Sequence, residues 1–503
     1  MLQGTASSVG KSVLVTALCR IFHQDGFKVA PFKSQNMALN SFVTTEGGEI
    51  GRAQAVQAQA AGIAPTVDMN PVLIKPEAGA KAQVIVMGKV AQHLNADNYS
   101  ENAPRLLKTI ENSFNRLRAA YDIIVIEGAG SPAEINLKER EIVNMRIAKM
   151  ADSPVLLVGD IDRGGVFAAL VGTLDLLDLG ERDRVKGFII NKCRRDVSLL
   201  KPGLDFLEAK TGKPVVGVIP YFRDIAIAQE DSVYLDERPA GSLGHGPDVA
   251  VIHLPHISNY DDFDPLEEAG CHVRYVDSPA KLGQPDLIIL PGTKSTVHDL
   301  IFLRQQGLAE AISRLKDAGT PVIGICGGYQ MLGQTIKDPC QVESSREVTE
   351  ALGFLEIDTI FSQQKTTRRV KGHIVAAKGF LAGLNDSAVE GYEIHMGQTV
   401  EPERSPLIRI TEATGDEAGY CDGAVSPDGL VCGTYFHGFF HNPEVTRVIV
   451  QYLGQRRGLA FQGKDLKGQD KEYDKLAAFV RSHLDIEKVY GIIGVKLKGK
   501  STT

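Results

Sequence analysis

A cysteine lies in the segment Pro321–Gly333, PVIGICGGYQMLG, at the point where an apolar, strand-like run gives way to a helix-like run. Glycines on both sides predict that Cys326 occupies a tight strand-to-helix turn, which is typical of a nucleophile. The N-terminus of the following helix would stabilise a thiolate, and the backbone N–H of Gly327 would face an oxyanion on the attacked carbonyl group. A buried structural cysteine is the alternative. The glycine-rich setting favours the nucleophile.

A cysteine nucleophile needs a general base, and the segment Gly433–Phe440, GTYFHGFF, supplies a histidine. His437 ends an apolar, strand-like run and is followed by glycine, so we predict that its imidazole is presented at the edge of a sheet. A lone histidine is more often structural, and His395 in the segment Tyr392–Gly397 is a second candidate. The strand-end setting favours His437 as the base.

A phosphate-binding site is predicted near the N-terminus, where Gly4–Ser12, GTASSVGKS, precedes a run with its apolar residues on one side of a helix. This is the pattern of a P-loop, although it is one residue longer than the standard spacing. Backbone N–H groups of the loop from Gly4 to Gly10 would cradle phosphate, and Lys11 would neutralise the β and γ oxygens. The hydroxyl of Ser12 is a candidate ligand for Mg²⁺.

Strand-like and helix-like segments alternate after the P-loop helix, which is typical of a parallel sheet with crossover helices. The candidate strands are 28–32, 84–87, 122–126, 154–158, 185–190 and 214–219, and in the second half 249–254, 272–276, 287–290 and 321–325. Ligands gather at the carboxyl ends of parallel strands. Glu127 and Asp160 follow two of these strands within two residues, so we predict them as Mg²⁺ ligands, with solvated loop carboxylates as the alternative.

The composition describes an ordinary globular protein. Of 503 residues, 43% are hydrophobic and 23% charged, and the net charge of -7 gives no basic excess that would indicate nucleic acid. No apolar run reaches the length of a membrane span and no signal peptide is evident, so we expect a cytoplasmic protein without a membrane partner. Seven cysteines without a CxxC pair indicate a reducing compartment and no structural zinc.

The length predicts two or three domains. We predict an ATP-binding domain over residues 1–245, a second α/β domain over 246–455 and a C-terminal helical tail over 456–503. Residues 222–247 are rich in Asp, Glu, Gly and Pro and are interpreted as a linker. The tail is interpreted as surface helices with a frayed, Lys-rich end at 496–500.

The segments around Cys326 and His437, together with Leu290–Ser295, LPGTKS, resemble the class I glutamine amidotransferase domain. The resemblance implies that the cysteine attacks the side-chain amide of glutamine, that the histidine protonates departing ammonia and that Gly292 offers a second oxyanion N–H. The usual glutamate two residues after the histidine is Phe439 here, so the third triad member is absent or comes from elsewhere. This departure resembles the branch of the family attached to cobyrinic acid amidation.

The P-loop resembles that of dethiobiotin synthetase and of the cobyrinic acid amidating enzymes, since Thr5 stands where a glycine is usual. Four further segments closely resemble the cobyric acid synthase family, within a match that runs from residue 4 to about residue 455: PFKSQNMALNS at 31–41, EIGRAQ at 49–54, MNPVLIKP at 69–76 and GDIDRGGVF at 159–167. Their many amides and few charges suggest a large polar ligand held by hydrogen bonds.

The resemblance implies a P-loop, dethiobiotin synthetase-like parallel-sheet domain followed by a glutamine amidotransferase-like α/β domain. ATP is then the co-substrate, with Asn191 at its adenine, Lys33 at phosphate and Glu49 near Mg²⁺. The expected activity is amidation of the b, d, e and g carboxylates of adenosylcobyrinic acid a,c-diamide, with glutamine as nitrogen donor. A homo-oligomer is an open option for the assembly. The nearest alternative is cobyrinic acid a,c-diamide synthase. A P-loop partitioning-type ATPase, a nucleotide switch without transfer chemistry, is the alternative of another class, and the Cys326–His437 pair argues against it.

Overall fold

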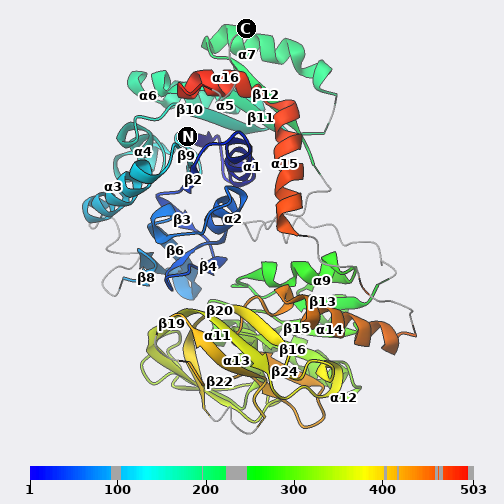
Figure 1. Cartoon of the computed structure of the whole chain (residues 1–503). Coiled ribbons are helices and arrows are strands. Elements are labelled where there is room, and N and C mark those ends of the chain that lie inside the picture. The colour runs from blue at the N-terminus through cyan, green and yellow to red at the C-terminus, as the bar shows by residue number, and fades with distance from the viewer. Residues whose placement is uncertain are drawn as a thin grey trace.

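The computed structural model describes residues 1–91, 103–194, 196–222, 246–400, 405–415, 418–458, 463 and 468–496, and these form two α/β bodies (Figure 1). Most of the predicted linker and most of the Lys-rich segment 496–500 lie outside the described residues. Among the described helices, none is both long and apolar enough to span a membrane.

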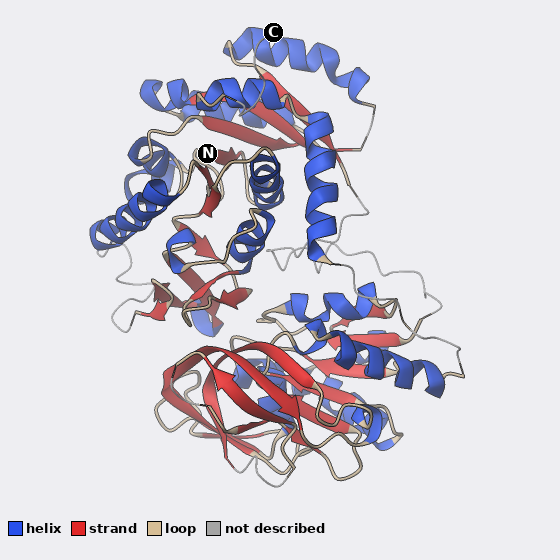
Figure 2. Cartoon of the chain, viewed as in Figure 1, coloured by secondary structure: helices blue, strands red, loops and turns tan. Residues whose placement is uncertain are grey.

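Parallel strands form the centre of the first body (Figure 2). Their spatial order is β2 (Val29–Phe32), β9 (Ile123–Ile126), β1 (Leu2–Gly4), β10 (Val155–Asp160), β11 (Val185–Cys193) and β12 (Val215–Pro220), with β9 joined to β1 by the Leu2–Glu127 bridge. All of them are parallel, so their carboxyl ends meet at one edge. That edge brings together the P-loop after β1, Glu127 after β9 and Asp160 at the end of β10.

Helices flank this sheet. They are α1 (Lys11–Gln24), α2 (Arg52–Ala60), α3 (Ala103–Ala120), α4 (Met145–Met150), α5 (Val166–Leu176), α6 (Leu179–Arg184) and α7 (Lys201–Thr211). The first is preceded by Gly10, whose φ of 95° lies in the left-handed region that favours glycine. Leu14, Leu18 and Ile21 recur on one side of α1 at helical spacing and are buried. The apolar periodicity seen in the sequence therefore fixes the helix that follows the P-loop.

A smaller sheet projects from the first body toward the second (Figure 1). It contains β3 (Gln35–Met37), β6 (Val72–Glu77), β7 (Lys81–Val86) and β8 (Lys89–Val90), beside the pair β4 (Ser41–Val43) and β5 (Glu49–Gly51). The segment 84–87, which we expected in the parallel sheet, instead pairs antiparallel with β6. The chain reverses at Gly79, whose φ of 75° permits a tight connection. The placement of 84–87 in the parallel sheet is therefore wrong, because this turn folds the segment back onto β6.

The second body has its own parallel sheet, in the order β14 (His272–Val276), β13 (Asp248–Ile252), β15 (Leu287–Leu290), β16 (Val322–Ile325) and β24 (Val431–Thr434), with antiparallel β23 (Ala424–Val425) at the edge. Its helices are α9 (Asp264–Glu268), α10 (Pro279–Leu282), α11 (Thr296–Gln305), α12 (Leu308–Asp317), α13 (Gly327–Leu332) and α14 (Pro443–Arg456). A further layer, not predicted from the sequence, comprises β17 (Thr335–Lys337), β18 (Val348–Glu350), β19 (Asp358–Ile374), β20 (Ala388–Val400), β21 (Ile408–Ala413) and β22 (Cys421–Asp422).

The tail returns to the first body as α15 (Gln469–His483) and α16 (Ile486–Ile493), which Figure 1 shows in red beside α1 and β12. Leu476 and Val480 of α15 are fully buried in the same hydrophobic cluster as the P-loop helix. Arg20 Nε of α1 lies 2.8 Å from Asp474 Oδ1. The sequence analysis interpreted the tail as surface helices; the structure shows that their apolar faces complete the core of the first body.

The two bodies meet through a buried polar interface. The backbone N–H of Ser41 donates to Asn259 Oδ1 over 2.8 Å, and the N–H of Asn259 donates to Asn40 Oδ1 over 2.7 Å. Arg52 Nε lies 2.9 Å from Asp261 Oδ2, with both side chains almost fully buried. Because removal of one partner of a buried ion pair leaves an uncompensated charge, these contacts specify how the bodies dock.

Candidate active sites

Cys326 occupies the sharp turn between β16 and α13, as predicted. Its φ of 50° and ψ of -108° are unusual for a residue with a side chain. The turn depends on glycine, since a Cβ on Gly328 would lie 2.0 Å from the carbonyl oxygen of Leu290. The N–H of Cys326 donates to Thr434 O over 2.8 Å, which ties the turn to β24. A nucleophile held in this way projects its sulfur beyond the end of the sheet.

His437 lies within hydrogen-bonding reach of the Cys326 side chain, and its Nδ1 lies 2.7 Å from Asp262 Oδ2. Both the histidine and the aspartate are almost fully buried. Burial lowers the pKa of His437, but the adjacent Asp262 carboxylate and its hydrogen bond raise it more, so that the pKa is about 10. The imidazole is therefore protonated near neutral pH.

Asp262 contacts His437 and is our candidate for the third triad member, which the sequence analysis left open. It belongs to a 3-10 helix, Tyr260–Phe263, that follows β13. Its Oδ2 accepts the Nδ1 hydrogen of His437, and its Oδ1 accepts the N–H of Gly438 over 2.8 Å. The signal that could have found it is the cluster of carboxylates in YDDFD, placed just after a buried strand of the same sheet.

The two predicted oxyanion donors lie in adjacent segments. A Cβ on Gly292 would approach His437 Cε1 to 3.0 Å, and a Cβ on Gly327 would lie 3.1 Å from the backbone nitrogen of Thr293. Asp299 Oδ2 accepts the Thr293 hydroxyl over 2.5 Å and thereby holds the loop after β15. This arrangement is compatible with both glycine N–H groups serving one oxyanion, which stays a prediction.

We expect His437→Asn to lower the kcat/KM of glutamine hydrolysis by roughly 10²–10⁴-fold, the range typical of a lost general acid–base group. His395→Asn is expected to have a smaller effect. The Nδ1 of His395 is directed to Gly397 O at 2.7 Å, and its ring stacks on Tyr435 with 3.9 Å between centroids, so its contacts are structural. Glutaminase assays on both folded variants check the ranking, and a larger loss for His395→Asn would contradict it.

Asp262→Asn should reduce glutaminase kcat/KM by roughly 10²–10⁴-fold. This range is typical when the carboxylate that orients a catalytic histidine is replaced in other triads. An asparagine has one oxygen, which the N–H of Gly438 would take, and would turn its NH₂ toward His437. The imidazole would then carry its proton on Nε2 and could not take the thiol proton.

The same variant changes the pH dependence of stability. The folded pKa of His437 lies above its ordinary value of 6.5, so its contribution to the free energy of unfolding is complete below about 6.5 and is lost as pH rises through about 10. The difference in unfolding free energy between wild type and Asp262→Asn should therefore shrink as pH rises across that window. Denaturant unfolding at several pH values measures it, and a pH-independent difference would contradict the assigned pairing.

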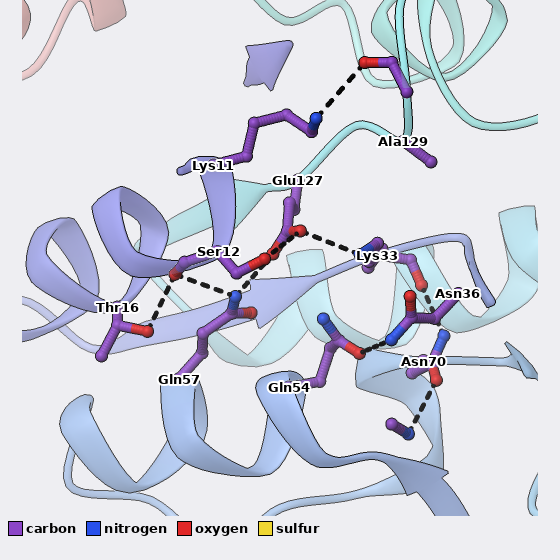
Figure 3. Close-up of polar contacts among 12 residues, drawn as sticks. Lys11, Ser12, Thr16, Lys33, Asn36, Gln54, Gln57, Asn70, Glu127 and Ala129 are labelled. Atoms are coloured by element: carbon purple, nitrogen blue, oxygen red, sulfur yellow. Dashed lines mark hydrogen bonds and ion pairs between the residues drawn. The ribbon is translucent and has the colours of Figure 1, made fainter. Parts of the chain in front are cut away.

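The P-loop lies in the first body, and its lysine reaches toward the segment at Ala129 that follows β9 (Figure 3). Lys11 Nζ donates to Ala6 O over 3.1 Å and to Gly130 O over 3.3 Å. A Cβ on Gly4 would lie 2.9 Å from Lys11 Nζ and 2.6 Å from the Val9 side chain, which explains the glycine at the start of the loop. The buried ammonium group is thus held at the anion-binding end of α1.

Three side chains contact the carboxylate of Glu127 at the carboxyl end of β9 (Figure 3). Its Oε1 accepts the Ser12 hydroxyl over 2.8 Å and Lys33 Nζ over 2.9 Å, and its Oε2 accepts Gln57 Nε2 over 2.6 Å. Sequence reasoning did not find Gln57, which lies in the alanine- and glutamine-rich helix α2. None of the family-like segments contains it, since EIGRAQ ends at Gln54.

The donor set fits Mg²⁺. A serine hydroxyl and a carboxylate oxygen are in contact, and both are hard oxygen ligands of the kind that Mg²⁺ takes beside nucleotide phosphates. The ammonium group of Lys33 contacts the same Oε1 and balances the charge of the carboxylate in this structure. Ser12 and Glu127 remain the predicted ligands.

Asn191 and Asp160 lie beside the P-loop in supporting positions. Asn191 Nδ2 donates to Val9 O over 2.8 Å, and a Cβ on Gly10 would lie 2.2 Å from that nitrogen. Asp160 Oδ2 lies 2.9 Å from Lys192 Nζ, which in turn donates to Ser8 O over 2.7 Å. Both side chains therefore brace the loop, while adenine recognition and metal binding by them stay predictions.

Glu49 requires a correction. The structure places it in the interface between the two bodies rather than in the Ser12–Glu127 cluster. Its Oε1 lies 2.9 Å from Lys75 Nζ, and its Oε2 lies 2.5 Å from Lys365 Nζ. Although burial opposes ionisation, these two ammonium groups hold the pKa of Glu49 well below its usual range. A carboxylate engaged by two lysines at a domain interface is not a Mg²⁺ ligand here.

Comparisons with known proteins match both bodies. Residues 1–233 match the CobQ/CobB/MinD/ParA nucleotide binding domain, and residues 248–445 match the CobB/CobQ-like glutamine amidotransferase domain. The chain is 57% identical to the cobyric acid synthase of Dehalococcoides mccartyi strain CBDB1, covering 98% of each chain. It is 51% identical to that of Pelotomaculum thermopropionicum, covering 98% of this chain and 96% of the relative. It is 53% identical to that of Photorhabdus laumondii subsp. laumondii, covering 97% of each.

These matches agree with a nucleotide-binding domain and a glutamine amidotransferase domain on one polypeptide. They also exclude the partitioning-type switch, because a glutamine amidotransferase domain is present. The chain belongs to the cobyric acid synthase family and is a glutamine-dependent amidating ligase.

Proposed function

We propose that this chain amidates the b, d, e and g carboxylates of adenosylcobyrinic acid a,c-diamide, with ATP as co-substrate and glutamine as nitrogen donor. The observation that carries the proposal is the assembly of two complementary sites on one chain. One site brings Cys326, His437 and Asp262 together, a set suited to releasing ammonia, and the other places Lys11, Ser12 and Glu127 at the P-loop, a set suited to activating a carboxylate with ATP. Family membership supports the corrinoid substrate.

In the second body, the Cys326 thiolate attacks the side-chain carbonyl carbon of glutamine. Gly292 and Gly327 N–H groups stabilise the oxyanion, and His437 protonates the leaving nitrogen as the C–N bond breaks. Ammonia and a cysteine thioester result, and water then hydrolyses the thioester to glutamate. Asp262 keeps the imidazole oriented throughout through its 2.7 Å contact.

In the first body, the terminal phosphoryl group of ATP passes to a corrinoid carboxylate, which gives ADP and an acyl phosphate. Lys11 offsets charge on the transferred group, and the P-loop N–H groups hold the neighbouring phosphate. Mg²⁺, when held by Ser12 and Glu127, would supply further charge neutralisation. Ammonia attacks the acyl carbon, the C–O bond to phosphate breaks, and an amide is formed.

The pocket at Cys326 lies at the boundary between the bodies, since Lys75 of the first body lines it together with residues of the second. Ammonia is therefore released next to the body that uses it. The free state of all seven cysteines supports the expected reducing, cytoplasmic location.

The test is incubation of the purified protein with Mg-ATP, glutamine and each candidate corrinoid, with mass spectrometry counting the amides formed. Adenosylcobyrinic acid a,c-diamide should gain four amides. A preference for cobyrinic acid, with two amides added, would instead favour the a,c-diamide synthase reaction. Omission of ATP is the control and should stop amidation while leaving glutamine hydrolysis measurable.

A further inference from the structure

The pocket at Cys326 carries charged groups that hydrolysis of an amide does not use. Besides the catalytic residues, its lining includes Lys75, Lys294, Lys365 and Glu343. All of them are at least partly buried. Charges withdrawn from water need partners, so their concentration beside the nucleophile indicates recognition of a charged part of the substrate.

The three lysines that line this pocket, Lys75, Lys294 and Lys365, outnumber the carboxylates that contact them. Lys365 and Lys75 share the carboxylate of Glu49, and Lys294 Nζ lies 2.6 Å from Glu77 Oε1. Three ammonium groups thus face two carboxylates. Burial lowers the pKa of Lys365 to about 8, which leaves it mainly protonated near neutral pH. An anionic group in the pocket would compensate the excess charge.

Glu343 is placed in the pocket by a turn that hydrogen bonds to Asp338 hold in shape. The buried carboxylate of Asp338 accepts the N–H groups of Val342, Glu343 and Ser344, each over 2.8 Å. Glu343 Oε1 accepts the N–H of Val297 over 2.9 Å. Burial raises the pKa of Glu343 to about 8, so in the empty pocket the group is largely uncharged near neutral pH. An arriving cation would favour its carboxylate form.

We propose that Glu343 binds the α-ammonium group of glutamine and that Lys294 and Lys365 face its α-carboxylate. The pocket then recognises the amino-acid end of the substrate while Cys326 attacks the amide end. This inference rests on the proposed glutaminase function and assigns to that site the residues that select glutamine among primary amides. Glu49 and Glu77 of the first body position the lysines, so the specificity site is completed by both bodies.

The test compares three amides as substrates for hydrolysis: L-glutamine, glutaramate, which lacks the α-ammonium group, and 4-aminobutanamide, which lacks the α-carboxylate. Wild type should prefer glutamine over either analogue by about thirtyfold or more in kcat/KM, as expected for a buried charged contact. Glu343→Gln should raise the KM for glutamine by a similar factor with little change in kcat, and should leave glutaramate hydrolysis unchanged. Glu347→Gln, an exposed change in the same segment, is the matched control and should behave as wild type.

Equal losses with glutamine and glutaramate in Glu343→Gln would show a structural role and overturn the proposal. If that variant does not fold, wild type alone decides, because hydrolysis of either analogue as efficiently as glutamine also overturns it. Absence of glutamine hydrolysis in wild type would overturn the proposed function and this inference together. Corrinoid amidation with ammonium salts, measured on the same samples, shows independently whether the first body is active.

Discussion

Cys326→Ala is expected to abolish glutamine-dependent amidation while leaving ammonium-dependent amidation largely intact. The thiol serves only to release ammonia, and the P-loop site that makes the acyl phosphate lies in the other body. Alanine is small enough for the turn between β16 and α13, so the fold should persist. The measurement is amide formation by mass spectrometry with glutamine and with an ammonium salt as alternative donors.

The control for this variant is Cys432→Ala. Cys432 is fully buried in the adjacent strand β24 and burial raises the pKa of its thiol, so it has no thiolate role. It should retain both activities apart from a modest loss of stability. Failure of ammonium to rescue a folded Cys326→Ala protein would refute the division of labour between the two bodies.

Lys11→Ala is expected to eliminate amidation with either nitrogen donor. The buried ammonium group is the charge partner for the transferring phosphoryl group, and loss of one such positioned charge commonly costs several kcal/mol in the transition state. Turnover would then fall near background, whereas glutamine hydrolysis at Cys326 need not be lost. Corrinoid amidation with ammonium as donor, beside an ATP-binding measurement, tests this expectation.

Lys192→Ala provides a comparison for the same experiment. Lys192 Nζ contacts Ser8 O and Asp160 at the outside of the P-loop, so its removal should weaken the loop without deleting the phosphate partner. We expect a partial loss there and a near-complete loss for Lys11→Ala. Activity of Lys11→Ala close to wild type would remove the phosphate-cradle assignment and the acyl-phosphate mechanism.

Features encoded in short segments could be predicted from the sequence. Buried parallel strands are continuous apolar runs, and a glycine-flanked cysteine or a GKS sequence marks a turn whose geometry is local. Cys326 and Lys11 are therefore found at the turn and at the helix start that the sequence predicted, whereas His437, expected to be presented at the edge of a sheet, is buried. The mixed layer from β17 to β22 was not predicted because its two long strands, β19 and β20, are partly exposed and contain no comparable apolar run, and several of its other strands are very short.

Pairings between distant segments could not be read in this way. Asp262 and His437 are 175 positions apart, and Glu49 and Lys365 are 316 apart. Each partner alone is an unremarkable charged residue, and only the docking of strands and bodies brings them together. The expected Mg²⁺ role of Glu49 failed for this reason: a motif beside the P-loop in sequence faces the other body in space.

The packing of α15 and α16 against α1 and β12 has a consequence for how the protein is made. The nucleotide-binding body is built from segments that precede and follow the glutaminase body in the chain. On the ribosome, the segments that precede it must therefore wait with part of their apolar surface uncovered until α15 and α16 have been translated. The glutaminase body can complete its own core earlier. The order in which the two bodies are synthesised thus differs from the order in which they finish folding. A chain truncated before α15 would leave apolar surface of the nucleotide-binding body exposed to chaperones and proteases.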